Sequence, residues 1–192
     1  NMANDSQKKE KVHPWRLCIC GEHWVSTHPL RVKPSKKNPS GITTRRGHCA
    51  KNPSRKDSLY PDEIKEISSE HFSTLKGPPE ADNLGYKYGN DYDFLIRGWT
   101  KYWNEVFKPS EPLDPDLVKA LISTESGFKK GIEIPAGRGL GKARGLMQIT
   151  DQTQKALFNH NTEVKDHLVT VSQNEMTDPN LNICAGIRWL FY

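Results

Sequence analysis

The sequence contains no long hydrophobic run. No stretch approaches the roughly 18 consecutive apolar residues of a membrane-spanning helix, and the N-terminus lacks the apolar core of a signal peptide. We therefore expect no membrane insertion. Apolar residues make up only 34% of the 192 residues, and the mean hydropathy is -0.76. These values predict that part of the chain is extended or loop-like rather than packed into one tight core.

Acidic residues are scarce in the first third of the chain. Residues 1–58 hold 13 Lys and Arg against 4 Asp and Glu, whereas residues 59–192 hold 15 against 19. Such a basic segment favours an anionic partner, and lysines that serve only solubility are the alternative. The sequence has no helix-turn-helix, no RNP-type aromatic pattern and no standard zinc-finger spacing, so we expect no nucleic-acid partner.

Cysteine is also rare, and three of the four cysteines lie in the basic segment. Thiolates and imidazoles suit a structural zinc, although their spacing here fits no strong zinc pattern. A disulfide between Cys18 or Cys20 and Cys49 is the main alternative and suits a protein outside a reducing cytoplasm. Reduced thiols without a bound metal are the third alternative for these cysteines. The candidate zinc ligands are Cys18, Cys20, His23, His48 and Cys49.

The character of the chain changes near residue 58. Short β-type stretches separated by turn residues come before it, at residues 23–28 and 41–46. A short helix with Pro61 in its first turn and a linker at Lys76–Asp91 come after it. The expected domains are a basic Cys/His-containing module (1–58), a helix and linker (59–91) and a catalytic domain (92–192).

The last hundred residues carry apolar side chains at helical spacing. This pattern predicts helices over residues 93–107, 116–128 and 178–192, the second of them started by Asp114 and Pro115. Cys184 lies among apolar residues of the third helix, where we expect it to be buried. Residues 129–143 contain four glycines and one proline and are expected to form a loop. The predicted fold is mainly α, preceded by an irregular module with a few short strands.

Two segments of this region carry the residues that a glycosidase needs. In LISTESGF (Leu121–Phe128), Glu125 follows the apolar Leu121 and Ile122 by one turn, so we expect it to face inward near a cleft. Burial against apolar groups is the usual way to keep a carboxylic acid protonated near neutral pH. A solvated surface glutamate is the alternative.

In GLMQIT (Gly145–Thr150), the side chains suit a sugar-binding wall. Gly145 permits close approach of the backbone to a ligand, and Met147 offers an adaptable apolar contact for a pyranose face. Gln148 can both donate to and accept from an N-acetyl or hydroxyl group. A third segment reads Asp178, Pro179, Asn182, Ile183, Gly186, Ile187 and Leu190.

These three segments, in this order, resemble the motifs of the lytic transglycosylase and goose-type lysozyme superfamily over residues 92–192. The resemblance implies a lysozyme-like helical domain that cleaves peptidoglycan without a catalytic cofactor, with Glu125 as the general acid. It also implies a chain that is incomplete at its C-terminus, because the family's AYN-type element and a tyrosine are absent. By the same resemblance Ser126 supports Glu125, and the substrate-binding residues are Gly145, Leu146, Met147 and Gln148.

The type of reaction depends on a second carboxylate. An inverting hydrolase needs one to activate water. Glu133 and Asp151 are the candidates, although each could equally be a surface charge. With one of them the protein would be a muramidase, which we favour at this stage. Without one it would be a lytic transglycosylase, which forms 1,6-anhydro products.

A non-catalytic cell-wall-binding module is the alternative from another class. The expected location is the bacterial cell wall or periplasm, reached by secretion or delivery without a visible signal peptide. The expected setting is that of a lysis factor or an antibacterial effector, with an immunity or inhibitor protein as a possible partner.

Overall fold

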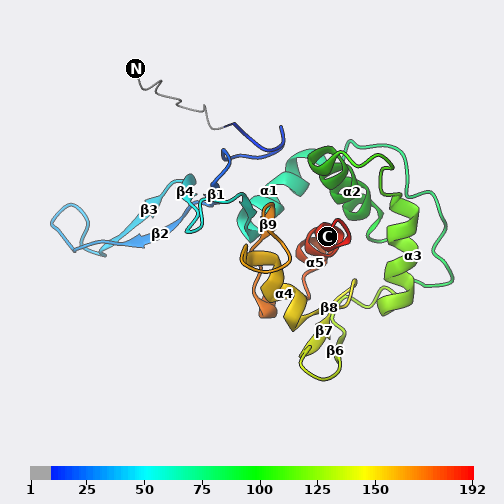
Figure 1. Cartoon of the computed structure of the whole chain (residues 1–192). Helices are drawn as coiled ribbons and strands as arrows, with labels where there is room; N and C mark the ends of the chain where they lie inside the picture. Colours follow the sequence, from blue (N-terminus) through cyan, green and yellow to red (C-terminus); the bar gives the residue numbers. More distant parts are fainter. Residues whose placement is uncertain (1–9) are drawn as a thin grey trace, which may run out of the picture.

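The computed structural model describes residues 10–192, so the first nine residues of the expected basic module lie outside it. A central helix, α5 (Pro179–Leu190), is surrounded by the other helices (Figure 1). Every residue of α5 from Leu181 to Arg188 is buried, as expected for a helix that has apolar or small residues on all sides. The surrounding helices are α1 (Pro61–His71), α2 (Asp93–Phe107), α3 (Pro115–Ser126) and α4 (Asp151–Phe158).

The expected helix starts are confirmed. Asp114 precedes Pro115, and its side chain accepts a hydrogen bond from the backbone N–H of Asp116. Asp178 precedes Pro179 in the same way and accepts from the N–H of Leu181. In both cases a carboxylate caps the helix, and proline occupies a position where no N–H is needed. Helix α4 and the 3-10 turn η1 (Gln173–Glu175) were not expected from the sequence.

The strands of the basic segment form one long antiparallel hairpin. The pairs Glu22 with Lys51 and Arg31 with Ile42 keep the same register, with a break at residues 26–27 and 46–47. The short strands expected at residues 23–28 and 41–46 are thus confirmed. The four strands are β1 (Glu22–Val25), β2 (His28–Arg31), β3 (Ile42–Arg45) and β4 (His48–Lys51).

The remaining strands are short and lie among the helices. The expectation that residues 129–143 form only a loop is wrong, because β6 and β7 pair there. Three glycines with positive φ, at 137, 139 and 141, reverse the chain between them. These strands are β5 (Ser58–Leu59), parallel to β9 (Leu168–Val169), and the three-stranded sheet of β6 (Glu133–Pro135), β7 (Lys142–Arg144) and β8 (Ile149–Thr150).

Helices account for about 33% of the residues that the structure describes, an average share for a soluble domain. The helices around α5 and the preceding strands are consistent with the predicted helical domain and strand-containing module, whereas a mainly α fold is not confirmed for residues 10–192 as a whole. The core lies between these helices, where Trp99, Tyr102 and Trp103 of α2 are almost completely buried. Cys184 is also fully buried, as expected. Within residues 10–192, no helix is long and apolar enough to cross a bilayer.

A buried ion-pair cluster attaches the N-terminal segment to α1. The guanidinium of Arg16 donates to Asp57 at 2.8 Å and to Glu63 at 2.8 Å, and none of the three side chains is more than 4% exposed. Burial works to raise the pKa of Asp57, but the ring of His167, whose Nδ1 lies 3.6 Å from the carboxylate, and the guanidinium of Arg16, which donates hydrogen bonds to it, outweigh burial and lower that pKa. Paired and hydrogen-bonded charges of this kind persist inside a protein because each satisfies the other. The division of the chain at residue 58 stays a prediction.

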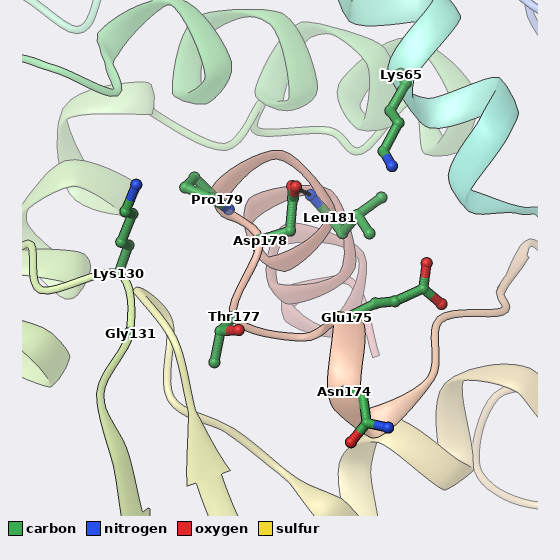
Figure 2. Close-up of a pocket in the computed structure, with 9 residues that line it drawn as sticks. All are labelled: Lys65, Lys130, Gly131, Asn174, Glu175, Thr177, Asp178, Pro179 and Leu181. Atoms are coloured by element: carbon green, nitrogen blue, oxygen red, sulfur yellow. Dashed lines mark hydrogen bonds between the residues drawn. The ribbon is translucent and has the colours of Figure 1, made fainter.

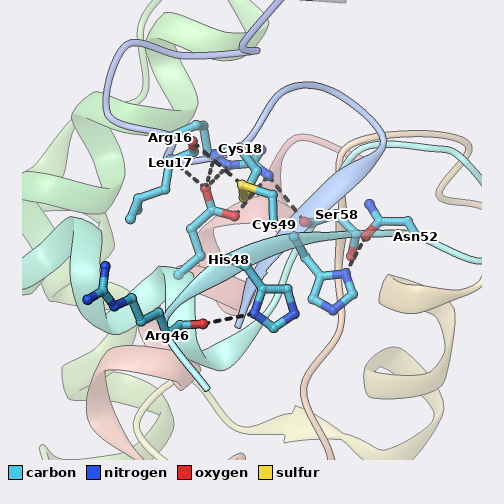
Figure 3. The surroundings of a disulfide bond; sticks show 10 residues. Arg16, Leu17, Cys18, Arg46, His48, Cys49, Asn52 and Ser58 are labelled. Atoms are coloured by element: carbon cyan, nitrogen blue, oxygen red, sulfur yellow. Dashed lines mark hydrogen bonds and ion pairs between the residues drawn. A yellow bond between two sulfur atoms is a disulfide. The ribbon is translucent and has the colours of Figure 1, made fainter. Parts of the chain in front are cut away.

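A disulfide closes the base of the long hairpin. Cys18 and Cys49 are joined at 2.03 Å beside Arg16 and Leu17 (Figure 3). This pair was one of the alternatives for the cysteines. The zinc alternative is not supported, because the bond occupies two of its ligands and no group of three His, Cys, Asp or Glu within residues 10–192 could hold a metal. His23 instead hydrogen-bonds to Asn52, and His48 to the carbonyl of Arg46.

Removal of this disulfide is expected to destabilise the protein by roughly 3.5 kcal/mol, since the bond closes a loop between residues 31 positions apart and restricts the unfolded chain. The double variant Cys18→Ala/Cys49→Ala should therefore unfold at a clearly lower urea concentration. Reductant should lower the midpoint of the wild type and leave that of the variant unchanged. An equal response of both proteins to reductant would contradict the assignment.

Candidate active site

A cleft of about 300 Å³ opens between α3 and α5. The segment that joins β7 to α4 forms part of its lining. We call this cleft the α3–α5 cleft and define it by the residues that line it. They are Leu121 and Glu125 of α3, residues 147–150, Thr153 of α4, and Gly186, Trp189 and Leu190 of α5.

Glu125 lies in the last turn of α3, at the edge of the cleft. The helix ends at Gly127, which has a φ of 57°, a conformation that favours glycine at a helix end. The expectation that Glu125 faces inward is wrong, because its side chain is exposed. The inward residue of this turn is Ser126, whose hydroxyl donates to the carbonyl of Ile122 at 3.1 Å. Glu125 is therefore open to the cleft and free to meet a ligand.

The segment Gly145–Gln148 makes a tight turn below Glu125. Gly145 has a φ of 73°, and a side chain there would collide with the amide nitrogen of Asn182. Gln148 also has a positive φ, 49°, and its side-chain amide donates to the carbonyl of Gly145 at 2.9 Å. A strained conformation in a non-glycine residue persists only where the surroundings enforce it, and such residues cluster at functional sites.

Asn182 of α5 provides that enforcement. Its side chain is fully buried, and its oxygen accepts from the N–H of Met147 at 2.8 Å. Its amide nitrogen donates to the carbonyls of Arg144 at 2.9 Å and Met176 at 2.8 Å. One buried amide thus hydrogen-bonds to three backbone groups from separate parts of the chain. Asn182 is a positioning residue for the turn.

The predicted substrate-binding residues separate into two groups. Met147 and Gln148 line the α3–α5 cleft. Gly145 and Leu146 do not line it, since both are buried and Leu146 is fully enclosed in the core. Ser126 is buried as well. Gly145, Leu146 and Ser126 can therefore support the residues that line the cleft but do not contact a ligand in it. The roles of all five predicted residues stay proposals.

The two candidates for a second carboxylate are both bound to Arg144. Its guanidinium donates to Glu133 at 2.8 Å and to Asp151 at 2.9 Å. The backbone N–H of Lys142 also donates to Asp151. Neither Glu133 nor Asp151 lines the α3–α5 cleft. The arrangement ties the β6–β7 hairpin to the start of α4.

Acid is expected to loosen this connection. Burial works to raise the pKa of Asp151, but hydrogen bonds from Arg144 and from the backbone N–H of Lys142 outweigh it and lower that pKa. A carboxyl group whose pKa is lower in the folded protein stabilises the fold above its unfolded pKa of about 4, and that stability is lost as the pH falls further. The unfolding midpoint in urea should therefore depend less steeply on pH below about 4 in Asp151→Asn than in the wild type. Equal slopes would contradict the ion pair.

Several residues of the cleft were missed by sequence reasoning. Trp189, Thr153 and Leu121 line it, and Trp189 stacks on Tyr192 with 5.0 Å between ring centroids. Aromatic and apolar side chains of this kind typically line ligand sites. Arg144 could have been noticed because it comes directly before GLMQ, and the third segment already contained Asn182. No sequence signal indicated Thr153, because α4 itself was not expected.

A second, larger cavity of about 460 Å³ lies at the start of α5 (Figure 2). Lys65 and Lys130 line it together with Glu175 and Asp178, so its charges are mixed. None of the predicted site residues lines this cavity. We therefore do not assign the active site to this cavity, although it is the larger of the two. We assign the active site to the α3–α5 cleft because Glu125 lines it.

Comparison with known proteins agrees with this assignment. Residues 104–191 match the family described as the transglycosylase SLT domain. The match contains all of α3 and the whole lining of the α3–α5 cleft. No curated protein and no solved structure matched the chain. Residues 104–191 thus belong to the transglycosylase SLT domain family, and the protein is an enzyme of the lytic transglycosylase and lysozyme-like superfamily, which acts on peptidoglycan.

Proposed function

We propose that this protein is a lytic transglycosylase that cuts the β-1,4 bond between N-acetylmuramic acid and N-acetylglucosamine, with Glu125 as the catalytic acid and base. The observation that carries the proposal is that Glu125 is the one carboxylate lining the α3–α5 cleft in the part of the chain that the structure describes. One carboxyl group is sufficient when the substrate supplies its own nucleophile.

In this reaction the carboxyl group of Glu125 first gives its proton to the oxygen of the leaving N-acetylglucosamine, and the bond to C1 of N-acetylmuramic acid breaks. The resulting carboxylate then accepts the proton of the 6-hydroxyl group of the same N-acetylmuramic acid. The 6-oxygen bonds to C1 and closes the 1,6-anhydro ring. No water is consumed, and Glu125 regains its proton.

The surroundings of Glu125 suit the first step. Leu121, Met147 and Leu190 line the cleft beside it, and a sugar ring bound there would displace water from the carboxyl group. Gln148 and Thr153 bring polar groups to the same cleft, where they can bind N-acetyl and hydroxyl groups of the substrate.

Muramidase activity is the second candidate, and it needs a base to activate water. Glu133 and Asp151 are less suited to that task, because each already accepts a charged hydrogen bond from Arg144. Burial works to raise the pKa of Asp151, but hydrogen bonds from Arg144 and from the backbone N–H of Lys142 lower it, so this carboxylate is a weaker base than a free one. This engagement with Arg144 favours the transglycosylase over the muramidase.

Digestion of purified peptidoglycan, with products identified by mass spectrometry, tests the proposal. Muropeptides that carry 1,6-anhydro ends, lighter by one water than the hydrolysis products, would support the transglycosylase. Reducing ends would establish a muramidase and direct attention to Glu133 or Asp151. Binding to peptidoglycan without any product would instead favour a non-catalytic module.

A further inference from the structure

The outer half of the long hairpin forms a basic arm. We define the basic arm as residues 28–46, which comprise β2, β3, the ten residues between them and Arg46. It contains six Lys and Arg, no Asp or Glu, and no Phe, Tyr or Trp. In Figure 1 the strands β2 and β3 extend away from the helices. The cations of the basic arm are Arg31, Lys33, Lys36, Lys37, Arg45 and Arg46.

The charged side chains of the basic arm are exposed and form no ion pair. All six cations are exposed, and none has a carboxylate within ion-pair distance among residues 10–192. The apolar Leu30, Val32 and Ile42 are also exposed, at 39%, 38% and 55%. A two-stranded ribbon that covers neither of its faces is marginal by itself. The arm is therefore a surface that gains from a partner.

The acidic helical part of the protein does not neutralise this charge. Strands rise about 3.3 Å per residue, so β2 and the two residues after it carry the cations roughly 20 Å along the ribbon. Screening in about 0.15 M salt reduces interactions between exposed charges beyond about 8 Å. The tip cations, Lys33, Lys36 and Lys37, are thus available to an external anion.

We propose that the basic arm binds the free carboxylates of the peptidoglycan peptides and holds the enzyme on its insoluble substrate. The identity of the polymer, peptidoglycan, rests on the proposed function. The preference for an anionic group rests on the positive charge of the arm. A duplex or single-stranded nucleic acid is the rival partner. A single strand is disfavoured because the arm has no Phe, Tyr or Trp side chain on which a base could stack.

Binding along a polymer already engaged at the cleft increases the apparent affinity without any new contact in the cleft. Linking two binding sites raises the overall affinity by about 10²- to 10⁴-fold when the geometry permits both to be occupied. Exposed charges contribute to such binding in a salt-dependent way. The arm should therefore matter most at low ionic strength and for the intact, insoluble wall.

The test is co-sedimentation with purified peptidoglycan sacculi that have been stripped of phosphate polymers. Every protein carries Glu125→Gln, so that cleavage, and any failure of the proposed reaction, does not affect the measurement. The test variant is Lys33→Gln/Lys36→Gln/Lys37→Gln. The control removes the same charge from exposed lysines outside the arm and is Lys56→Gln/Lys155→Gln/Lys165→Gln.

The test variant is expected to bind about 10-fold more weakly in about 0.15 M salt, and the control variant to bind like the parent. When the carboxyl groups of the sacculi have been converted to neutral amides, the parent should bind them only as tightly as the test variant does. The affinity of the test variant should change little. Equal losses in the two triple variants would overturn the proposal, and so would undiminished binding of the parent to amidated sacculi. If the parent bound a DNA duplex more tightly than sacculi, and the test variant lost that binding, nucleic acid would be the partner instead.

Discussion

Replacement of Glu125 with glutamine is expected to lower the rate of glycan cleavage about 10²- to 10⁴-fold, the contribution that a general acid makes to such reactions. The amide has nearly the same shape as the carboxyl group but cannot deliver a proton to the leaving oxygen. Glu125 is exposed and makes no hydrogen bond that supports the fold. The free energy of unfolding, measured in urea, should therefore change by less than about 0.5 kcal/mol. The rate is measured as release of soluble muropeptides from purified sacculi.

Glu133→Gln is the matched control, since it makes the same chemical change at a carboxylate outside the α3–α5 cleft. Arg144 would keep its bond to Asp151, and the rate should stay within a few-fold of the wild type. A loss in Glu133→Gln as large as the loss in Glu125→Gln would show that two carboxylates act together, which would favour hydrolysis. A wild-type rate in Glu125→Gln would remove the proposed acid altogether.

Replacement of Asn182 with leucine is the second prediction with a large effect. The substitution keeps the number and branching of the side-chain heavy atoms but leaves three backbone groups, at Arg144, Met147 and Met176, without this hydrogen-bond partner. Buried groups that lose their hydrogen bonds cost about 1 to 3 kcal/mol each and do not add fully, so we expect a loss on the order of 3 kcal/mol. Activity should fall as well, because the turn that carries Met147 and Gln148 would no longer be held in place.

Ile183→Val separates this polar effect from packing. Ile183 is the next residue of α5 and is fully buried, and the loss of one methylene group costs about 0.5 to 1.5 kcal/mol. That variant should be slightly less stable and retain its cleavage rate under conditions where it is folded. If Asn182→Leu lost stability but kept the full rate of the folded protein, the role of Asn182 in positioning the turn would be contradicted.

The sequence predicted the helices whose ends carry a local signal. Asp114 with Pro115 marks the start of α3, and apolar spacing marks α2 and α5. Local capping chemistry and side-chain periodicity depend on near neighbours, so they can be recognised without the fold. The short strands of the hairpin were recognised in the same way. By contrast, α4 has only eight residues and few apolar ones, and it depends on packing against its surroundings.

The residue types of the candidate site could also be read from the sequence, but their geometry could not. Periodicity suggested that Glu125 faces inward, yet the helix ends just beyond it and leaves the side chain exposed at the cleft. The grouping of Glu133 and Asp151 around Arg144 joins residues from β6, β7 and α4. Such a contact is set by the pairing of the hairpin and the position of α4, neither of which spacing along the chain can give.

By itself, the sequence determined the kind of enzyme, because the residue types in its three ordered segments are sufficient to place it in the superfamily. It also determined the charge of the N-terminal segment. Only the tertiary structure decided which carboxylate is open to the cleft, that Cys49 pairs with Cys18, and that Asn182 holds the turn. The physical reason is that residue type sets what a side chain can do, whereas burial and partners depend on contacts between segments far apart in the chain.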